Sequence, residues 1–303
     1  MIDSYITGKI ERMSPEAPVP IISVTNKEER LGGAANVALN IQALGAKPIV
    51  CSVSGDDHNT KTLHQLFRKN KLSTEGLLEI KNRPTTVKIR IISNNKHVLR
   101  LDEETLIEIS LAEEKLLLNK ITSIIKKQKI SVVIFEDYNK GCITPSLIKE
   151  VVKLAAKKKI PVAVDPKKRN FLAYKDVTLF KPNLKELKEG LKIKNLNPEN
   201  KREVEQAAEA LRKKLNAELV LLTLSENGMY ISDEKNKHHS AAHKRNVIDV
   251  SGAGDTVIAV AALCLASKTD SKTLVQLANL AGGLVCEKAG VVPVDKKLLM
   301  KET

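Results

Sequence analysis

The sequence predicts an α/β fold in which helices cover both faces of a mostly parallel sheet, with a small β lid attached. Short runs rich in Val, Ile and Leu alternate with amphipathic runs along most of the 303 residues. That alternation is typical of a parallel sheet with crossover helices. Two other stretches carry strand-like runs with no helix between them, which predicts the lid. Two glycine-rich turns, at residues 32–33 and 252–254, each open an apolar helical run.

The elements of the main sheet follow from β-branched runs and from apolar residues at helical spacing. Strands are expected at 48–53, 131–135, 161–164, 177–180 and 218–224. Amphipathic helices are expected at 59–70, 145–158 and 201–215, and a buried helix is expected after residue 256.

The lid is predicted from residues 19–24 and 85–101. In the second stretch, Asn94 and Asn95 stand between two alternating runs, which is typical of a hairpin. We expect a small antiparallel sheet with strands near 4–30 and 84–103. The chain shows no internal repeat and no linker, so residues 1–303 are expected to form a single domain.

Charge and composition limit the partners. The chain has 50 basic and 36 acidic residues and a net charge of +14, but 40 of the basic residues are Lys. Base readout and stacking favour Arg and aromatic residues, and the chain has four Tyr, four Phe and no Trp. We therefore expect no nucleic-acid partner. The positive charge would instead help to attract a phosphorylated small molecule.

Hydropathy and cysteine spacing indicate a cytoplasmic protein with no membrane partner. No apolar run approaches the ~20 residues of a membrane span, and the first residues lack the apolar core of a signal peptide. The four cysteines lie far apart without zinc-type spacing, as expected of reduced thiols. His238, His239 and His243 have no neighbouring ligand to complete a metal set, so we expect a solvated hairpin there.

The clearest motif is DVSGAGDT, residues 249–256, which precedes a buried helix. A glycine-rich turn at a helix N-terminus offers backbone N–H groups to an anion. Gly252, Ala253 and Gly254 would form this cradle, and Asp255 stands beside it to accept a hydroxyl proton. Together they suit phosphoryl transfer to an alcohol. The alternative is a glycine-rich helix start in which the carboxylate of Asp255 only favours the helix dipole.

A second glycine pair opens another helix near the N-terminus. Gly32 and Gly33 would let a polar ligand approach the backbone, and Asn36 would present an amide from the first turn. The alternative is a tight turn whose small residues serve helix packing. The sequence contains no Walker A motif, no protein-kinase signature and no GxGxxG fingerprint.

GGAANVALNIQALGA and DVSGAGDT together resemble the ribokinase, or PfkB, family of sugar kinases, and three further motifs follow that family's order. NLKE, residues 183–186, matches its NxxE motif, and TLSENG, residues 223–228, resembles the turn that lines the nucleotide. ANLAGG, residues 278–283, resembles the helix beside the adenine. The resemblance implies a ribokinase-like fold and an ATP-dependent sugar kinase.

The resemblance also implies a role for particular residues. Asp255 would be the catalytic base at the 252–254 cradle, and Asn183 and Glu186 would hold Mg²⁺ through water. The nucleotide would contact Asn183, Leu184, Lys185, Glu186, Thr223, Ser225, Gly228 and Asn279. The sugar hydroxyls would contact Asp3, Gly32, Gly33 and Asn36. A monovalent cation would lie near Asp249, and a homodimer would form through the lid.

One branch of the family is the most similar. Residues 12–20, 85–104, 136–141 (EDYNKG) and 165–167 (DPK) resemble the kinases of D-glycero-β-D-manno-heptose 7-phosphate. This implies phosphorylation of the anomeric hydroxyl to the 1,7-bisphosphate, a step toward ADP-heptose for lipopolysaccharide. Other sugars, such as ribose or fructose 1-phosphate, and a non-catalytic nucleotide-binding module are the alternatives.

The non-transferred phosphate of such a substrate needs cations near the lid. Lys88 and Arg90 alternate with apolar residues, so both face one side of a strand. The alternative is a solvated strand face.

The sequence departs from this branch at two points, the residues after DPK and the start of the chain. Lys168, Arg169 and Asn170 stand where relatives often have Gly, which makes this rim more basic. Relatives carry an upstream strand that ends in a Gly-Asp pair. Asp3 would match the Asp of that pair, but the strand before it is missing from this sequence, so we expect a misassigned or truncated start. Asp3 would then lie on a frayed terminus. Many relatives are fused to a nucleotidyltransferase with an HxGH-type motif, which this chain lacks, so we expect the kinase alone.

Overall fold

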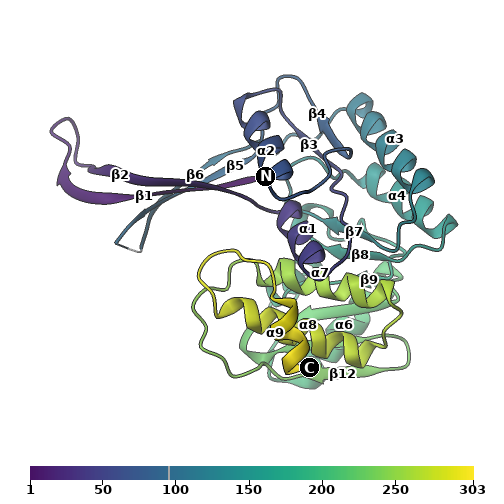
Figure 1. The fold of residues 1–303 in the computed structure, drawn as a ribbon. Helices are drawn as coiled ribbons and strands as arrows, with labels where there is room; N and C mark the ends of the chain where they lie inside the picture. The colour runs from purple at the N-terminus through teal and green to yellow at the C-terminus, as the bar shows by residue number, and fades with distance from the viewer. Residues whose placement is uncertain (95) are drawn as a thin grey trace. The chain divides into compact units, whose positions relative to one another are not determined.

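A computed structural model describes residues 1–94 and 96–303 (Figure 1). The chain divides into two compact units. The first unit comprises residues 1–35 and 49–107, and the second comprises residues 36–48 and 108–303. Within the described residues, no helix combines the length and the apolar character that a membrane crossing requires.

The first unit contains a four-stranded sheet in the order β2-β1-β5-β6, drawn as the long ribbon in Figure 1. Its strands are β1 (Ile2–Met13), β2 (Pro20–Leu31), β5 (Val87–Ser93) and β6 (Lys96–Glu103). The expected all-antiparallel arrangement is wrong, because β1 and β5 pair in parallel. The two hairpins are antiparallel, but the strands that join them are far apart in sequence and run in the same direction.

Strand alternation gives this sheet two different faces. On one face Asp3 and Tyr5 of β1 stand beside Arg30 of β2 and Lys88 and Arg90 of β5, as the strand register shows. The opposite face carries the apolar side chains of Ile6, Ile89, Ile91, Leu99 and Leu101, and Lys27 and Glu29 of β2 stand on the same face. The apolar face is not fully covered within the chain, since Leu99 is 52% exposed and Leu101 46% exposed.

The remainder of the first unit is a short helix beside a two-stranded parallel sheet. Helix α2 (His58–Lys69) begins where Asp57 accepts a hydrogen bond from the Thr60 N–H, and it buries Leu63 and Phe67. Strands β3 (Ser52–Ser54) and β4 (Leu77–Glu79) form the sheet. The strand expected at 48–53 therefore begins later than predicted. Asn94 lies in the predicted turn with φ of 49°, and Asn95 lies outside the described residues.

The second unit is built on a six-stranded sheet in the order β12-β11-β10-β9-β8-β7. The four parallel strands are β7 (Val133–Glu136), β8 (Val162–Asp165), β9 (Leu179–Phe180) and β10 (Leu219–Thr223). The antiparallel strands β11 (Met229–Ser232) and β12 (Lys237–Ser240) complete it. The predicted α/β class, a mostly parallel sheet with helices, is confirmed.

Eight helices and two 3₁₀ turns of the described chain accompany this sheet. The helices are α1 (Ala34–Ala43, which enters the unit at Asn36), α3 (Leu111–Lys127), α4 (Pro145–Lys157), α5 (Leu184–Leu191), α6 (Lys201–Leu215), α7 (Ala253–Ala266), α8 (Ser271–Cys286) and α9 (Lys296–Glu302). The 3₁₀ turns span Lys168–Asn170 and Ser225–Asn227.

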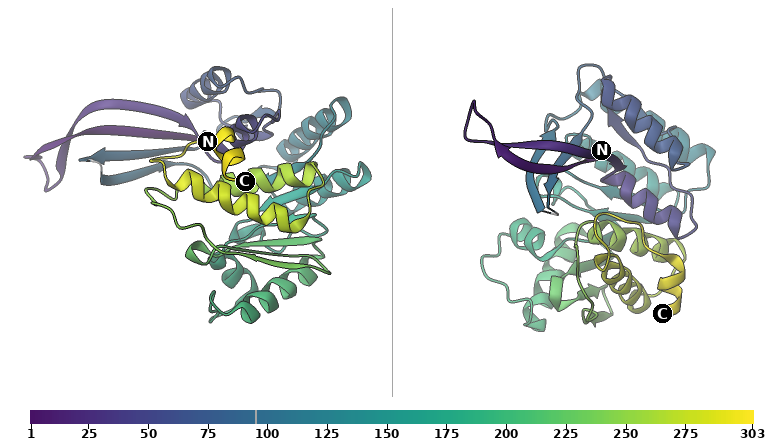
Figure 2. Two further views of the ribbon diagram at one scale, coloured as in Figure 1. Left: turned by 60° about the horizontal axis from the view of Figure 1, so that its bottom comes forward. Right: turned by 60° about the vertical axis from the view of Figure 1, so that its left-hand side comes forward.

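The main core of the second unit lies between the sheet and helices α7 and α8. Leu221 of β10 and Ile231 of β11 pack there with Ile258 of α7 and Leu284 of α8, and all are buried. Helix α6 lies against β10 and β11 as well (Figure 2). Because the sheet is covered, the polar groups at the carboxyl ends of its parallel strands are held on a rigid support.

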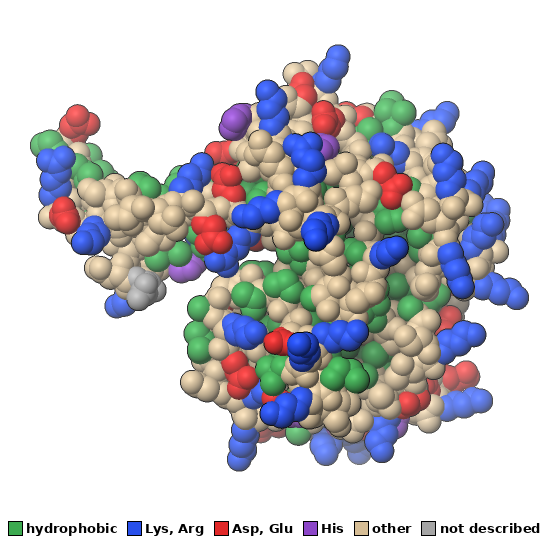
Figure 3. All heavy atoms as spheres, viewed as in Figure 1, with side chains coloured by type: hydrophobic (Ala, Val, Ile, Leu, Met, Phe, Trp, Pro, Cys, Tyr) green, Lys and Arg blue, Asp and Glu red, His purple; other side chains and the backbone are tan. Residues whose placement is uncertain are grey.

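Lys and Arg side chains are scattered over the face shown in Figure 3 among polar and apolar groups. This distribution is that of solvated helix and loop surfaces.

Gly190 in α5 shows how closely the second unit is packed. A side-chain carbon at this position would lie 2.1 Å from Cε1 of Phe171, a buried residue whose ring meets Phe180 edge-on at 5.1 Å. Helix α5 therefore depends on glycine for its approach to this aromatic pair.

We expect Gly190→Ala to lower the free energy of unfolding by about 1–3 kcal/mol, the usual effect of overpacking a core. Helix propensity alone predicts the opposite sign, a gain of about 1 kcal/mol. Denaturant unfolding of the two proteins distinguishes these predictions. In a Phe171→Leu background the cost of the same change should shrink, and an equal cost would show that the ring is not the obstacle.

Candidate active site

Polar residues gather at the carboxyl ends of three neighbouring parallel strands in the second unit. Glu136 ends β7 and pairs in register with Asp165, which ends β8, while Lys181 directly follows β9. This edge is where open α/β sheets bind their ligands. The site is therefore set by strand pairing, which places side chains from distant parts of the sequence next to one another.

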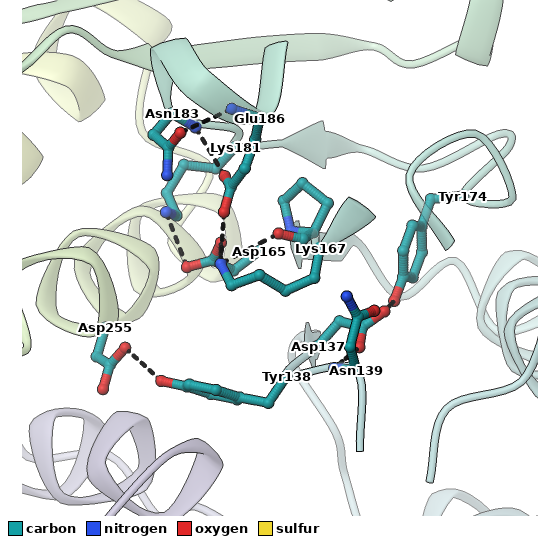
Figure 4. Close-up of polar contacts among 11 residues, drawn as sticks. Asp137, Tyr138, Asn139, Asp165, Lys167, Tyr174, Lys181, Asn183, Glu186 and Asp255 are labelled. Atoms are coloured by element: carbon teal, nitrogen blue, oxygen red, sulfur yellow. Dashed lines mark hydrogen bonds and ion pairs between the residues drawn. The ribbon is translucent and has the colours of Figure 1, made fainter. Parts of the chain in front are cut away.

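Two lysines balance the acidic groups at this edge (Figure 4). Lys181 Nζ lies 2.8 Å from Asp165 Oδ2, and both side chains are almost fully buried. Lys167 Nζ lies 2.5 Å from Glu186 Oε1 and 3.6 Å from Asp165 Oδ1. Burial alone would lower the pKa of Lys181, but the Asp165 carboxylate outweighs it and raises that pKa. Lys181 is therefore a fixed positive charge.

Glu136 lies in the same cluster, but burial and its carboxylate neighbours dominate its electrostatic environment. Burial raises its pKa well above the usual range, and the neighbouring carboxylates of Asp165 and Asp255 raise it further. Glu136 Oε2 and Asp165 Oδ1 are buried and accept no hydrogen bond from the described residues. This edge of the sheet therefore holds buried carboxyl oxygens that have no hydrogen-bond partner among the described residues.

Asn183 and Glu186 form a capping box at the start of α5. The Asn183 side chain accepts a hydrogen bond from the Glu186 N–H, and Glu186 Oε2 accepts one from the Asn183 N–H. The second oxygen of Glu186 contacts Lys167. These residues thus cap a helix, as any NxxE sequence can, while one carboxylate oxygen still faces the charged cluster. Leu184 and Lys185 occupy the first turn of the helix.

The glycine turn 252–254 lies beside this cluster. Gly252 precedes α7 with φ of 82°, and a side-chain carbon there would lie 3.0 Å from Val291 Cγ1. A side-chain carbon on Gly254 would lie 3.8 Å from Lys181 Nζ and 3.9 Å from Asp165 Oδ2. The first N–H groups of α7, which begins at Ala253, are therefore next to a buried cation.

Asp255, in the first turn of α7, is held by two donors. Asn36 Nδ2 donates to Oδ2 at 2.7 Å. The Tyr138 hydroxyl donates to Oδ1 at 3.0 Å (Figure 4). Partial burial raises the pKa of Asp255, and the two hydrogen bonds oppose that rise. The carboxylate is thus positioned beside the glycine turn with acceptor capacity left over, since each oxygen has more than one lone pair.

The residues predicted to line the nucleotide are brought together in part. Thr223, at the end of β10, forms a bridge with Asn183, so the 223–228 turn and the 183–186 motif are adjacent. Ser225 and Gly228 adopt positive φ values of 54° and 79° in the turn that connects β10 to β11. Asn279 of α8 instead donates to Ser240 Oγ and the Ala241 carbonyl, which fixes the end of β12.

Asp249 stabilises the loop that precedes the glycine turn. Its carboxylate accepts hydrogen bonds from the N–H groups of Ser251 at 2.9 Å and Gly290 at 3.0 Å. These contacts hold the 249–251 segment against the loop that follows α8.

The predicted sugar-binding residues of the first unit are well ordered in their own sheet. Asp3 is paired on both sides within β1 and is only 6% exposed, so the expectation of a frayed terminus is wrong. A neighbouring strand on each side supplies the support that an upstream strand was expected to give. A side-chain carbon on Gly32 would lie 2.2 Å from Asp3 Oδ2, so a larger residue there would displace the Asp3 carboxylate. Gly33 has φ of 59° at the start of α1.

The two predicted phosphate-binding cations are both ion-paired. Arg90 Nη1 lies 2.7 Å from Asp3 Oδ1, and its guanidinium stands 5.2 Å from the ring centre of Tyr5. Lys88 Nζ contacts Asp102 at 3.1 Å and Glu104 at 3.2 Å. A phosphate would have to share these cations with carboxylates.

Sequence reasoning missed the residues Tyr138, Glu136, Asp165, Lys167 and Lys181 as parts of the site. Four of these residues belong to the motifs EDYNKG and DPK, which resemble one branch of the family but had no chemistry assigned to them, and Lys181 directly follows the strand expected at 177–180. The available signal was position, because a polar residue at the carboxyl end of a parallel strand faces the ligand edge.

Comparison with known proteins gives a consistent result along the whole chain. The model of the family described as pfkB family carbohydrate kinase matches residues 4–297. The chain is 41% identical over 295 residues to the bifunctional protein HldE of Campylobacter jejuni, covering 97% of the chain and 61% of that protein. It is 38% identical over 301 residues to HldE of Koribacter versatilis, covering 99% and 60%. The chain thus spans about three fifths of the length of these relatives.

Solved structures share the fold at low sequence identity. A mutant of phosphofructokinase-2 from Escherichia coli superposes with a TM-score of 0.80 at 18% identity, covering 99% of this chain and 94% of that one. Ribokinase from Arabidopsis thaliana, complexed with ribose and ATP, superposes with a TM-score of 0.74 at 18% identity, covering 99% and 95%. The ribokinase-like fold predicted from sequence is confirmed.

Proposed function

The chain belongs to the pfkB family of carbohydrate kinases, and we propose that it phosphorylates the anomeric hydroxyl of D-glycero-β-D-manno-heptose 7-phosphate with ATP. The product would be the 1,7-bisphosphate. As a carbohydrate kinase, the protein is a phosphotransferase with an alcohol group as acceptor. The observation that carries the proposal is the position of Asp255, directly after the glycine turn and beside the buried Lys181–Asp165 pair.

Asp255 would act as the base that takes the proton from the attacking hydroxyl. The hydroxyl must lose its proton as the new P–O bond forms, and the acceptor must stand beside the transferring group. The N–H groups at the start of α7 and the fixed charge of Lys181 would hold the phosphoryl oxygens. Asn36 keeps one oxygen of Asp255 in place while the carboxylate accepts the proton.

The residues at the carboxyl edge fit Mg²⁺. The described residues contain no preformed group of three His, Cys, Asp or Glu side chains, but Mg²⁺ needs only one or two carboxylates plus phosphates and water. Asp165 Oδ1, which accepts no hydrogen bond from the described residues, faces the cluster that contains Glu186 and Asn183. These oxygens would hold the ion, directly or through water. When bound, Mg²⁺ would neutralise charge on the ATP phosphates.

A monovalent cation is proposed near Asp249, in the loop before the glycine turn. The support is that Asp249 organises this loop through two backbone N–H groups, and that a solved structure of phosphofructokinase-2 of the same fold is a complex with potassium.

The choice of sugar rests on sequence. Residues 12–20, 85–104, 136–141 and 165–167 resemble the heptose-phosphate branch, and the HldE relatives match over nearly the whole chain. Asp3, Gly32, Gly33 and Asn36 are proposed to bind sugar hydroxyls, and Lys88 and Arg90 the 7-phosphate. The main alternative is a kinase for another sugar; one structure of the same fold is phosphofructokinase-2 in complex with fructose-6-phosphate.

A homodimer through the four-stranded sheet is also part of the proposal. The support is the group of apolar side chains on one face of that sheet, among which Leu99 and Leu101 remain about half exposed. A second copy of the same face would remove this apolar surface from water.

A panel of substrates tests the function directly. We expect ATP-dependent ADP release with heptose 7-phosphate. Its kcat/KM should be at least tenfold above that with ribose, fructose 1-phosphate or fructose 6-phosphate. A tenfold preference corresponds to about 1.4 kcal/mol of extra binding. Higher turnover of another sugar would reassign the substrate within the family. ATP binding without turnover of any sugar would favour a non-catalytic module.

Changing Asp255 to Asn tests the base. Asn keeps the size of the side chain but removes its basicity, so we expect kcat to fall by roughly 10²–10⁴. The KM for ATP should stay near that of the wild type, because the glycine turn is intact. A folded variant with near-normal kcat would contradict both the mechanism and the site.

The role of Arg90 is tested by comparing two sugars. If its guanidinium binds the 7-phosphate, Arg90→Ala should raise the KM for heptose 7-phosphate by roughly tenfold or more, the loss of one charge-assisted contact. It should raise the KM for unphosphorylated heptose by a smaller factor, because only the ion pair with Asp3 is then lost, and it should leave the KM for ATP unchanged. If Arg90 only holds Asp3, both sugars should lose affinity equally. Arg100→Ala serves as the matched control, because Arg100 pairs with Arg90 in register and is more exposed.

A further inference from the structure

Tyr138 is a partly buried group that contacts the proposed base. Its hydroxyl donates to Asp255 Oδ1 at 3.0 Å, on the oxygen opposite to the one that Asn36 contacts. We propose that Tyr138 is the positioning residue that keeps Asp255 ionised and oriented for proton transfer. The inference rests on the proposed role of Asp255 as base, and goes beyond it by assigning a function to the tyrosine of the EDYNKG turn.

The turn after β7 is built to aim this side chain. Asn139 adopts φ of 55° and Gly141 φ of 71°, and the chain bends at residues 139–143, directly after β7. The Asn139 N–H donates to Asp137 Oδ1 at 2.8 Å, and Asp137 Oδ2 accepts from Tyr174 and from Asn170. Asp137 thus fixes the bend through these contacts, while Tyr138 points away from this network toward Asp255 (Figure 4).

The direction of the hydrogen bond follows from the charges around it. Burial raises the pKa of Tyr138 well above its ordinary value, and the negative charge of Asp255 raises it further. The phenol therefore keeps its proton and serves as a permanent donor. A permanent donor stabilises the carboxylate form of its partner, which is the form that a base needs.

Such a donor is needed because other groups around Asp255 oppose ionisation. Partial burial disfavours the charged carboxylate, and the negative charge of Asp165 adds to this effect. The electrostatic influence of Asp255 also reaches Glu136 at the end of β7. Lys181 is the cation that acts in the other direction. The hydrogen bonds from Tyr138 and Asn36 supply the remaining stabilisation.

The test is Tyr138→Phe, which removes the donor and keeps the ring. Loss of the donor destabilises the carboxylate, so the pKa of Asp255 should rise by about one unit. A base works only when ionised, so the acid limb of kcat/KM against pH should move to higher pH by the same amount. The rate deficit should be largest at low pH and shrink as the pH rises, while the KM for ATP stays constant.

Tyr174→Phe is the matched control. Tyr174 is a buried tyrosine whose hydroxyl also donates to a carboxylate, at 2.9 Å, but that carboxylate is Asp137. Asp137 keeps its contacts with Asn170 and the Asn139 N–H in this variant. We expect the acid limb to stay where it is in the wild type.

A second measurement needs no substrate. Carbon-13 NMR of protein labelled at the aspartate carboxyl carbon, with the Asp255 signal identified by its loss in Asp255→Asn, reports the pKa directly. The Asp255 signal should titrate at higher pH in Tyr138→Phe, and its pKa in Tyr174→Phe should equal that of the wild type. If Tyr138→Phe does not fold, 3-fluorotyrosine at position 138 replaces it; its more acidic phenol is a stronger donor, so the pKa of Asp255 should fall.

The outcomes separate this inference from the substrate assignment. The expected NMR shift without turnover of heptose 7-phosphate would leave the role of Tyr138 standing and remove the sugar. An unchanged Asp255 titration in folded Tyr138→Phe, or an equal shift in Tyr174→Phe, would overturn the inference. So would a higher KM for the sugar with an unmoved acid limb, because it would make Tyr138 a substrate contact.

Discussion

The buried ion pair between Lys181 and Asp165 is the interaction on which the site depends. Parallel strands end side by side, so any acidic residues at those ends are forced together in a region with little water. Without a buried cation, the charges of Glu136, Asp165 and Asp255 would repel one another and favour protonation. Lys181, at 2.8 Å from Asp165, compensates the charge of that carboxylate and opposes the repulsion at this edge of the sheet.

The same pair connects the separate parts of the site. Lys181 lies next to the position of Gly254, so the cation that compensates Asp165 also adjoins the turn that opens α7. Lys167 extends the network to Glu186 and so to the N-terminus of α5. A buried charge network of this kind is weak evidence for stability, but it fixes the relative positions of the side chains it contains. That geometric order is what phosphoryl transfer requires.

The first unit shows a related use of compensated charge. Asp3 is almost fully buried and is neutralised by Arg90, whose guanidinium also stands against Tyr5. Arg30 stands against the same ring and is paired with Glu28. The polar face of the four-stranded sheet is therefore a connected layer of ion pairs, while the opposite face carries the apolar side chains of β5 and β6. These two faces explain why the sheet carries both the proposed sugar-phosphate contacts and the proposed dimer surface.

The sequence by itself determined the fold class, the glycine turns and the position of Asp255 after one of them, because each depends on residues that are neighbours along the chain. Strand and helix periodicity, glycine at positive φ and a carboxylate in the first helical turn are all local properties. The partners of Asp255 were decided only by the tertiary structure, since Asn36 and Tyr138 are 219 and 117 residues away from it. The parallel pairing of β1 with β5 and the Lys181–Asp165 contact have the same origin. Strand register brings together side chains whose separation in sequence carries no signal, and the chemistry at the ends of the strands follows from that register.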